Sequence, residues 1–239
     1  MKIFNIVLFA LFVFNPFAAY SEATSKCDPL LNGINPKLMD AKRNPLLRQP
    51  RQSHNLPRYD LYRPEMILPA LKVEMDRLLK DWEKIGNQKA KPTFENTILA
   101  METPRPLLRQ AWGYMWVLKS TQSNDEIKAI VRANSAMTSE LGFKLYTNEK
   151  VFARVKVLYE DRHVLRLTRE ERRLIEDTYK SFVEYGVHLP KTERNRLEEI
   201  VKRLGELSAQ FDQTVTNKRD KFEFVISDKN ELKGIPPHI

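Results

Sequence analysis

Apolar residues recur at every third or fourth position through most of the chain after residue 64. This spacing is typical of an α-helix that buries one face. The first stripe consists of Ile67, Leu68, Leu71, Met75, Leu78, Trp82 and Ile85. Later stripes are formed by Leu107, Ala111, Met115 and Leu118, by Ile127, Ile130, Val131, Met137, Leu141 and Leu145, and by Phe152, Val155, Leu158 and Tyr159. The pattern therefore predicts a mainly α fold built from several helices.

Polar residues mark where these helices begin and end. Thr93 is expected to cap a helix that is ended near Glu102 by Pro104 and Pro106, because proline lacks the amide that continues a helix. Further N-caps are expected at Ser123 or Asn124 and at Asn148. These signals divide the stripes into separate helices joined by short connections.

The last two predicted helices have the clearest boundaries. Thr168 and Glu171 have the spacing of a capping box, and Gly186 is expected to supply a left-handed C-terminal cap. The following helix is expected over residues 191–217, with a stripe formed by Leu197, Ile200, Leu204, Leu207, Phe211 and Val215. Its alternation of three and four favours packing along an antiparallel partner helix.

One short strand is predicted after the helices. Residues 222–226, Phe-Glu-Phe-Val-Ile, are aromatic and β-branched, which is typical of a strand. A single strand leaves its backbone groups unpaired, so this segment is expected to need a partner.

The N-terminal segment predicts export. Lys2 precedes an apolar run at residues 3–14, Pro16 follows, and cleavage after Ser21 or Ala23 would satisfy the small-residue rule. The run is too short to span a bilayer, which needs about 20 residues. We therefore expect a signal peptide over residues 1–23, a secreted or periplasmic protein and no stable membrane span.

The next segment is punctuated by proline. Residues 24–63 contain Pro29, Pro36, Pro45, Pro50 and Pro57, which predicts an extended leader. Cys27 lies close enough to the signal segment to suggest a lipid anchor, but Lys26 occupies a position that should be small. Lipoprotein anchoring at Cys27 is therefore disfavoured.

Composition narrows the function classes. The formal charge of the 239-residue chain is +9, which on its own would favour nucleic acid or an anionic membrane as a partner. The basic residues are interleaved with acidic ones throughout, however, and this favours solvated helix faces. Neither a G-x-G-x-x-G nor a P-loop spacing occurs. The single cysteine excludes an internal disulfide and a cysteine-based zinc site.

No catalytic, cofactor-binding or metal-ligating residue is predicted. The four histidines are His54, His163, His188 and His238, and none has another histidine four residues away. Asp161 to His163 is interpreted as a surface turn, and Glu170, Glu171 and Glu176 as capping or solvated carboxylates. Trp82, Trp112 and Trp116 fall on or beside apolar stripes and are interpreted as core residues.

Several runs, in order, resemble the thimet oligopeptidase family of zinc metallopeptidases, and most of all oligopeptidase A and the bacterial peptidyl-dipeptidases. The most specific is Pro-Thr-Phe-Glu-Asn-Thr at residues 92–97. Asn-Pro-Leu-Leu at residues 44–47 is similar to the run that opens these enzymes. The segments at residues 145–155 and 173–183 also resemble the family, and the resemblance covers about residues 44–239.

The resemblance implies a fold and a parent reaction. Residues 64–239 are expected to form the helical N-terminal part of a neurolysin-like fold, truncated before the catalytic zinc domain. In the family this part forms one wall of a deep channel that admits short unfolded peptides, and zinc assists their hydrolysis. The family's His-Glu-x-x-His motif lies downstream and is absent here, so this chain is expected to be inactive alone and to bind no cofactor. Short peptides, and a separate catalytic part, are the expected partners.

Alternatives remain open at this point. A truncated gene, a split subunit and a gene-model fragment all fit the sequence. A non-catalytic helical module that binds peptides or a partner protein would need no zinc. A basic nucleic-acid-binding protein would show steep salt dependence, but the scattered charge and the export signal count against it.

Overall fold

The computed structural model describes residues 29–50, 56–122, 124–220, 223 and 233–234. The expected signal peptide at residues 1–23 and Cys27 lie outside these ranges. The strand expected at residues 222–226 also lies outside them, except for Glu223, which is not in a strand. Over the part that is described, the fold is mainly helical, as the apolar periodicity predicts.

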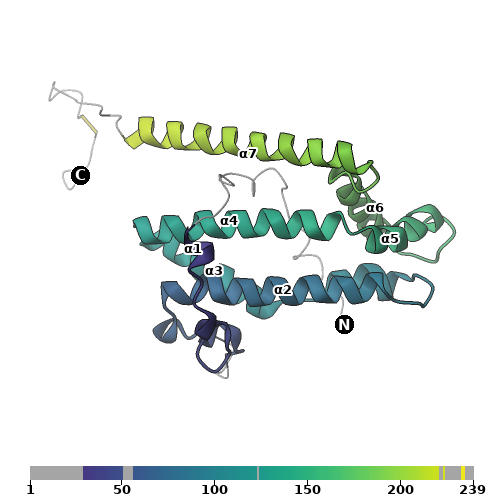
Figure 1. The fold of residues 1–239 in the computed structure, drawn as a ribbon, viewed down its shortest axis with the longest axis horizontal. Coiled ribbons are helices and arrows are strands. Elements are labelled where there is room, and N and C mark those ends of the chain that lie inside the picture. The colour runs from purple at the N-terminus through teal and green to yellow at the C-terminus, as the bar shows by residue number, and fades with distance from the viewer. Residues whose placement is uncertain (1–28, 51–55, 123, 221–222, 224–232, 235–239) are drawn as a thin grey trace.

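The central element is α2 (Ile67–Gly86), which contacts α3 (Pro106–Thr121), α4 (Asp125–Tyr146) and α5 (Glu149–Asp161). Figure 1 shows α2 and α4 running along the long axis of the molecule, with α5 and α6 (Arg169–Glu184) at one end. The helix α7 (Lys191–Asp220) forms an outer layer beside α4. No helix in the described ranges is long and apolar enough to cross a membrane.

The apolar stripes form the core between these helices. In α2, six of the seven predicted residues are buried, and Leu78 is partly buried against them. In α3, Ala111, Met115 and Leu118 are buried as predicted, whereas Leu107 is only half-buried and its neighbour Leu108 is buried. Pro106 is the first residue of this helix.

The segment after α2 begins as predicted but is wound differently. Thr93 caps η6 (Phe94–Leu99), and its side chain accepts a hydrogen bond from the Asn96 amide at 3.2 Å. The turn is π-helical, with the Ala100 amide donating to the carbonyl of Glu95, five residues earlier. A short α-helical stretch ends at Met101, close to the predicted end at Glu102.

The proline-rich leader differs from the expected extended chain. From residue 29 onward it forms short helical turns, and several of its side chains are buried in the core. The turns are α1 (Pro29–Asn32), η1 (Pro36–Met39), η2 (Pro45–Leu47), η4 (Tyr59–Leu61) and η5 (Pro64–Met66). Proline favours the first position of such turns, because its fixed φ suits a helix start. The prolines therefore start turns here instead of extending the chain.

Asn44 and Gln110 fix this leader to the helices. The Asn44 side chain is fully buried, donates to the carbonyls of Leu38 and Met66 at 2.9 Å each, and accepts from the Leu46 amide at 3.0 Å. Gln110 of α3 donates to the carbonyl of Leu46 at 3.1 Å. The Asn-Pro-Leu-Leu run is therefore a folded structural unit, not linker.

An aromatic cluster joins α2, α4, α5 and α6 at one end of the helical body. Trp82 of α2 and Tyr146 of α4 each lie within 6.0 Å of Phe182 of α6, measured between ring centroids. Phe152 of α5 stacks at 5.6 Å on Tyr179. This cluster holds α5 and α6 against α2 and α4.

The boundary between α6 and α7 follows the sequence signals. Thr168 and Glu171 form the predicted capping box, and Gly186 has a φ of 73°. Arg194, in the first turn of α7, donates to the carbonyls of Val187 and Leu189 and to Glu149 of α5. The start of α7 is therefore fixed to the body.

Candidate functional site

Arg154 on α5 donates four hydrogen bonds from its side chain to the connection between α2 and η6. Its side chain is only 6% exposed, and it donates to the carbonyls of Gln88 and Ala90 at 3.1 and 2.9 Å. It also donates to the side-chain oxygens of Gln88 at 3.3 Å and Asn96 at 2.7 Å. The guanidinium thereby fixes the connection between α2 and η6 onto α5.

Asn96 is the second centre of this junction. Its Oδ1 accepts from Arg154, from the Thr93 amide at 2.9 Å and from the Thr97 hydroxyl at 2.9 Å, while its Nδ2 donates to the carbonyl of Lys91 at 3.0 Å. The Asn96 side chain therefore forms hydrogen bonds both with the first turn of η6 and with the buried Arg154 guanidinium. No spacing or motif in the sequence predicts these contacts of Asn96 and Arg154, although both residues lie in the family-like runs.

The hydrogen bonds of this junction hold the backbone in place. All four acceptors of Arg154 are neutral: two backbone carbonyls and two side-chain amide oxygens. Burial lowers the pKa of the Arg154 guanidinium, because a desolvated cation is less stable. There is no nucleophile or general base beside it among these contacts. The junction holds the loop between α2 and η6 against α5.

The two histidines that the structure describes do not form part of a zinc site. His163 lies after α5 and His188 after Gly186, and both are exposed, while His54 and His238 lie outside the described residues. The residues that the structure describes contain no cluster of three His, Cys, Asp or Glu side chains suited to a metal. Zinc needs about three protein ligands in fixed geometry. The residues described do not fit a catalytic zinc.

The other candidate charged residues have structural partners. Arg162 stacks 4.0 Å from the Tyr159 ring centroid and donates to Glu176 at 3.2 Å. Glu171 accepts from the Thr168 amide at 2.8 Å, as its capping role requires. The interpretation of these residues as capping and surface groups is therefore confirmed for Glu171, and Glu176 serves as an ion-pair partner.

The tryptophans divide between core and surface. Trp82 is buried, and Trp112 donates from Nε1 to the Asn134 side chain at 2.9 Å. Trp116, however, is 52% exposed, with the Lys119 ammonium 4.3 Å from its ring centroid. The prediction that Trp116 is a core residue was wrong, because it lies on the outer face of α3.

The pKa of the Glu102 carboxyl is raised by its surroundings. Glu102 follows η6, and burial raises its pKa because the ionised form is poorly solvated there. It lies close enough to Tyr146 to raise the pKa of that phenol further, beyond the larger effect of burial. No sequence pattern singled out Glu102, since a polar residue before two prolines is normally solvated.

A hollow with an apolar lining lies between α1, α2 and α4. Its volume is about 180 Å³, and two ion pairs line it, Lys72 with Asp76 at 2.8 Å and Lys144 with Glu140 at 2.5 Å. Its apolar lining consists of Leu31, Ile34, Met75, Leu79, Met137 and Leu141. Small-molecule sites usually enclose at least about 300 Å³, so this hollow suits a single apolar side chain.

Comparison with known proteins points to peptidases. The chain is 29% identical over 194 residues to dipeptidyl carboxypeptidase of Salmonella typhimurium, covering 81% of this chain and 28% of that protein. It is 28% identical over 192 residues to dipeptidyl carboxypeptidase of Escherichia coli, covering 80% and 28%, respectively. It is 23% identical over 193 residues to oligopeptidase A of Escherichia coli, covering 81% and 28%.

This chain is related to the thimet oligopeptidase family. Both dipeptidyl carboxypeptidase and oligopeptidase A are members, so the resemblance of the sequence runs is confirmed. No family model matches the chain. The thimet oligopeptidase-like chain spans about 28% of the length of these relatives. The buried Asn44 and Arg154 and the partly buried Asn96 lie in the family-like runs, where their hydrogen bonds stabilise the fold.

Proposed function

We propose that this chain is the N-terminal, channel-wall part of a zinc-dependent oligopeptidase or peptidyl-dipeptidase. The observation that carries the proposal is the similarity to dipeptidyl carboxypeptidase and oligopeptidase A over about four-fifths of the chain. The mainly helical fold agrees with the helical wall that the family resemblance implies. In this proposal the chain contributes the shape of a peptide channel, and the zinc chemistry resides in a catalytic part.

The chain by itself is proposed to be inactive. Hydrolysis by these enzymes uses zinc held by a His-Glu-x-x-His motif, in which the glutamate is the general base for water. No position of this sequence has that motif. The described histidines, His163 and His188, are exposed on separate connections. We therefore expect neither stoichiometric zinc binding nor peptide cleavage by the purified chain.

A chimeric enzyme tests the proposed role. The matched segment of Escherichia coli dipeptidyl carboxypeptidase is replaced by residues 44–239 of this chain, and cleavage of a fluorogenic peptide is measured. We expect chelator-sensitive activity with a changed KM, because the wall contacts peptide while the catalytic part is unchanged. A chimera with the same thermal unfolding as the parent but no activity would contradict the proposal. So would chelator-sensitive cleavage by this chain alone.

A non-catalytic peptide-binding module is the second candidate. The hollow between α1, α2 and α4 favours it, since its apolar lining between ion pairs would accept one side chain of an extended peptide. Fluorescence anisotropy with labelled unfolded peptides distinguishes the two. Binding that a Leu79→Glu substitution abolishes, without turnover, would support the module. Binding unaffected by that substitution would exclude this hollow as its site.

A further inference from the structure

Three arginine side chains line a concavity on the solvent-facing side of α6. Its volume is about 490 Å³, within the range that small-molecule sites usually have. It is lined by Arg169, Arg172, Arg173 and Glu176. The last three residues follow Arg169 by three, four and seven positions, so all four lie on one face of the helix. The opposite face packs into the core through Ile175, Thr178 and Phe182.

The nearby carboxylates already have partners within the protein. Glu176 accepts a hydrogen bond from Arg162 at 3.2 Å, and Asp177 accepts one from Arg173 at 2.9 Å. Glu171 is held in the capping box at the start of α6. These three carboxylates are therefore engaged elsewhere and do not neutralise the other arginines of the concavity.

Arg169 and Arg172 form no ion pair with a carboxylate of the described residues. Arg172 donates from Nε to the carbonyl of Arg162 at 3.2 Å, which orients its guanidinium beside the concavity. Glu170 adjoins Arg169 in sequence, but successive residues of a helix lie about 100° apart around its axis. The concavity thus has two guanidinium groups that the described part of the chain leaves without a counter-ion.

This arrangement is electrostatically unfavourable for α6. Arg169 lies in the first turn, where the helix dipole disfavours a cation. It also has like charges three and four residues later, at Arg172 and Arg173, and such pairs destabilise a helix. Oppositely charged residues at these spacings, as in the pair of Arg173 with Asp177, are the usual pattern of a solvated face. An anion in the concavity would remove the repulsion.

We propose that the concavity lined by Arg169, Arg172 and Arg173, the α6 arginine site, binds a phosphate group. Guanidinium groups recognise phosphate through paired hydrogen bonds, and several of them suit an anion with several oxygens and more than one charge. A carboxylate offers two oxygens and a single charge, so it should bind more weakly. This inference goes beyond the proposed function and does not depend on it.

Isothermal titration of the purified chain tests the site. Inorganic phosphate, glycerol phosphate and acetate are each titrated at pH 8 and constant ionic strength, because salt screens exposed charges. We expect a Kd of about 1 mM for phosphate and at least about tenfold weaker binding of acetate. Equal affinity for glycerol phosphate would identify phosphate esters as ligands, whereas binding of inorganic phosphate alone would identify the free ion. Both results support a phosphate site.

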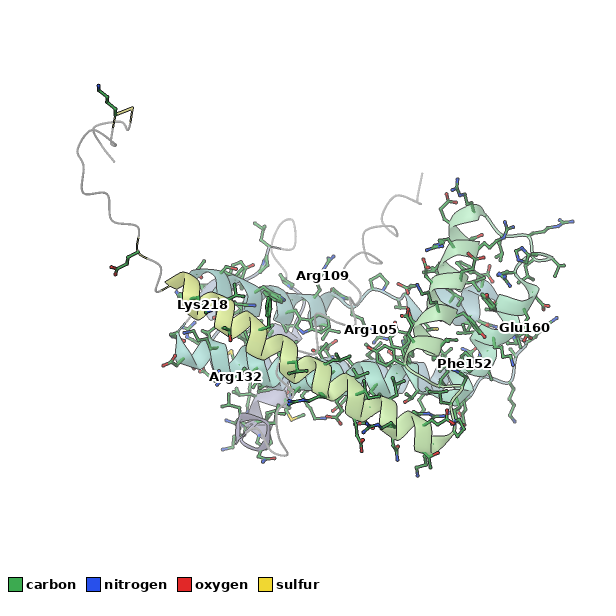
Figure 2. The ribbon with its side chains drawn as sticks, turned by 90° about the horizontal axis from the view of Figure 1, so that it is seen from above. Arg105, Arg109, Arg132, Phe152, Glu160 and Lys218 are labelled. Carbon is green, nitrogen blue, oxygen red and sulfur yellow. The ribbon has the colours of Figure 1, made fainter. Side chains whose placement is uncertain are left out.

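Substitution of the arginines locates the binding. Arg169→Gln and Arg172→Gln should each weaken phosphate binding about tenfold, since each removes charge-assisted hydrogen bonds. Arg132→Gln is the matched control, because Arg132 is an exposed arginine of α4 that forms no ion pair with a described carboxylate. Figure 2 shows Arg132 far along the molecule from Glu160, which lies near the end of α5 that leads to α6. The control should keep the affinity of the wild type.

Thermal unfolding separates a binding role from a structural one. Without phosphate, Arg169→Gln should keep or raise the melting temperature, because it relieves the repulsion. Phosphate at 10 mM should raise the melting temperature of the wild type by roughly 3 °C and that of Arg169→Gln by less than half as much.

Several results would overturn the proposal. These are no phosphate binding up to about 10 mM, acetate bound as tightly as phosphate, and an equal loss of affinity in Arg132→Gln. A melting temperature of Arg169→Gln that falls by several degrees without phosphate would also overturn it, because Arg169 would then stabilise the helix. Weakened phosphate binding in the two α6 variants alone, with helicity unchanged by circular dichroism, supports the site.

Discussion

Replacement of Arg154 by methionine should destabilise the protein strongly, although no ligand or active site is involved. Methionine keeps much of the aliphatic stem and removes the four hydrogen bonds to Gln88, Ala90 and Asn96. The connection between α2 and η6 would lose its attachment to α5. We therefore expect a lower free energy of unfolding and faster local opening of residues 87–93.

The magnitude follows from the contacts. Hydrogen bonds from a charged donor typically contribute about 1.5–3 kcal/mol each. Gln88 and Ala90 are exposed, so water can form some of the hydrogen bonds that their carbonyls lose in the variant. Removing a desolvated cation also returns some free energy. The net loss should be about 3 kcal/mol, which lowers the urea midpoint by about 1.5 M for an m-value near 2 kcal/mol/M.

Urea unfolding followed by circular dichroism measures this change, and hydrogen exchange reports the loop. Lys156→Met is the matched control on the same helix, because its ammonium lies 3.8 Å from Glu160 and its side chain is 53% exposed. Such an exposed pair contributes only about 0–1 kcal/mol. A midpoint for Arg154→Met equal to that of Lys156→Met would refute the assignment of Arg154 as the main attachment of this loop.

Three further substitutions test local features. Thr168→Ala should cost about 1 kcal/mol in urea unfolding, because it leaves the Glu171 amide without its cap, and Thr168→Ser should restore most of that loss. Gly186→Ala should lower the melting temperature by the equivalent of at least about 1–2 kcal/mol, since φ is 73° and the new methyl would meet Leu197 at 2.7 Å; an unchanged melting temperature would contradict the left-handed cap. Glu102→Gln should stabilise the chain at pH 7 and leave its stability nearly unchanged below pH 4. Because the pKa of Glu102 is raised in the folded state, the folded protein keeps this proton to a higher pH than the unfolded chain does. The stability of the wild type therefore falls as pH rises from the unfolded-state pKa through the folded-state pKa. Thermal melts across this pH range check it, and equal stabilisation at both ends would refute the sign.

The sequence by itself determined most of the helical pattern. The stripes in α2 and α4, the capping box at Thr168 and the cap at Gly186 depend on spacing and on local backbone hydrogen bonds, which neighbouring residues specify. Spacing alone led to wrong predictions where a side chain beside an apolar stripe could point either to the core or to solvent. Trp116 lies beside an apolar stripe in sequence, and only the packing of α3 against the other helices decides that it is exposed.

The tertiary structure alone decided the long-range contacts. Asn44 donates to Met66, 22 residues away, and Arg154 reaches the connection 64 and 66 residues earlier. Such contacts leave no periodic signal, because they depend on how helices pack and not on positions within one helix. The leader was predicted as extended for the same reason, since its prolines mark turns only once the core is present to receive Leu46. The apolar spacing indicates the character of each helix face, but packing decides which faces are covered. The α7 stripe is evident in the sequence, and only the structure shows that Leu197 packs on the preceding turn while the described residues leave Ile200 and Phe211 exposed.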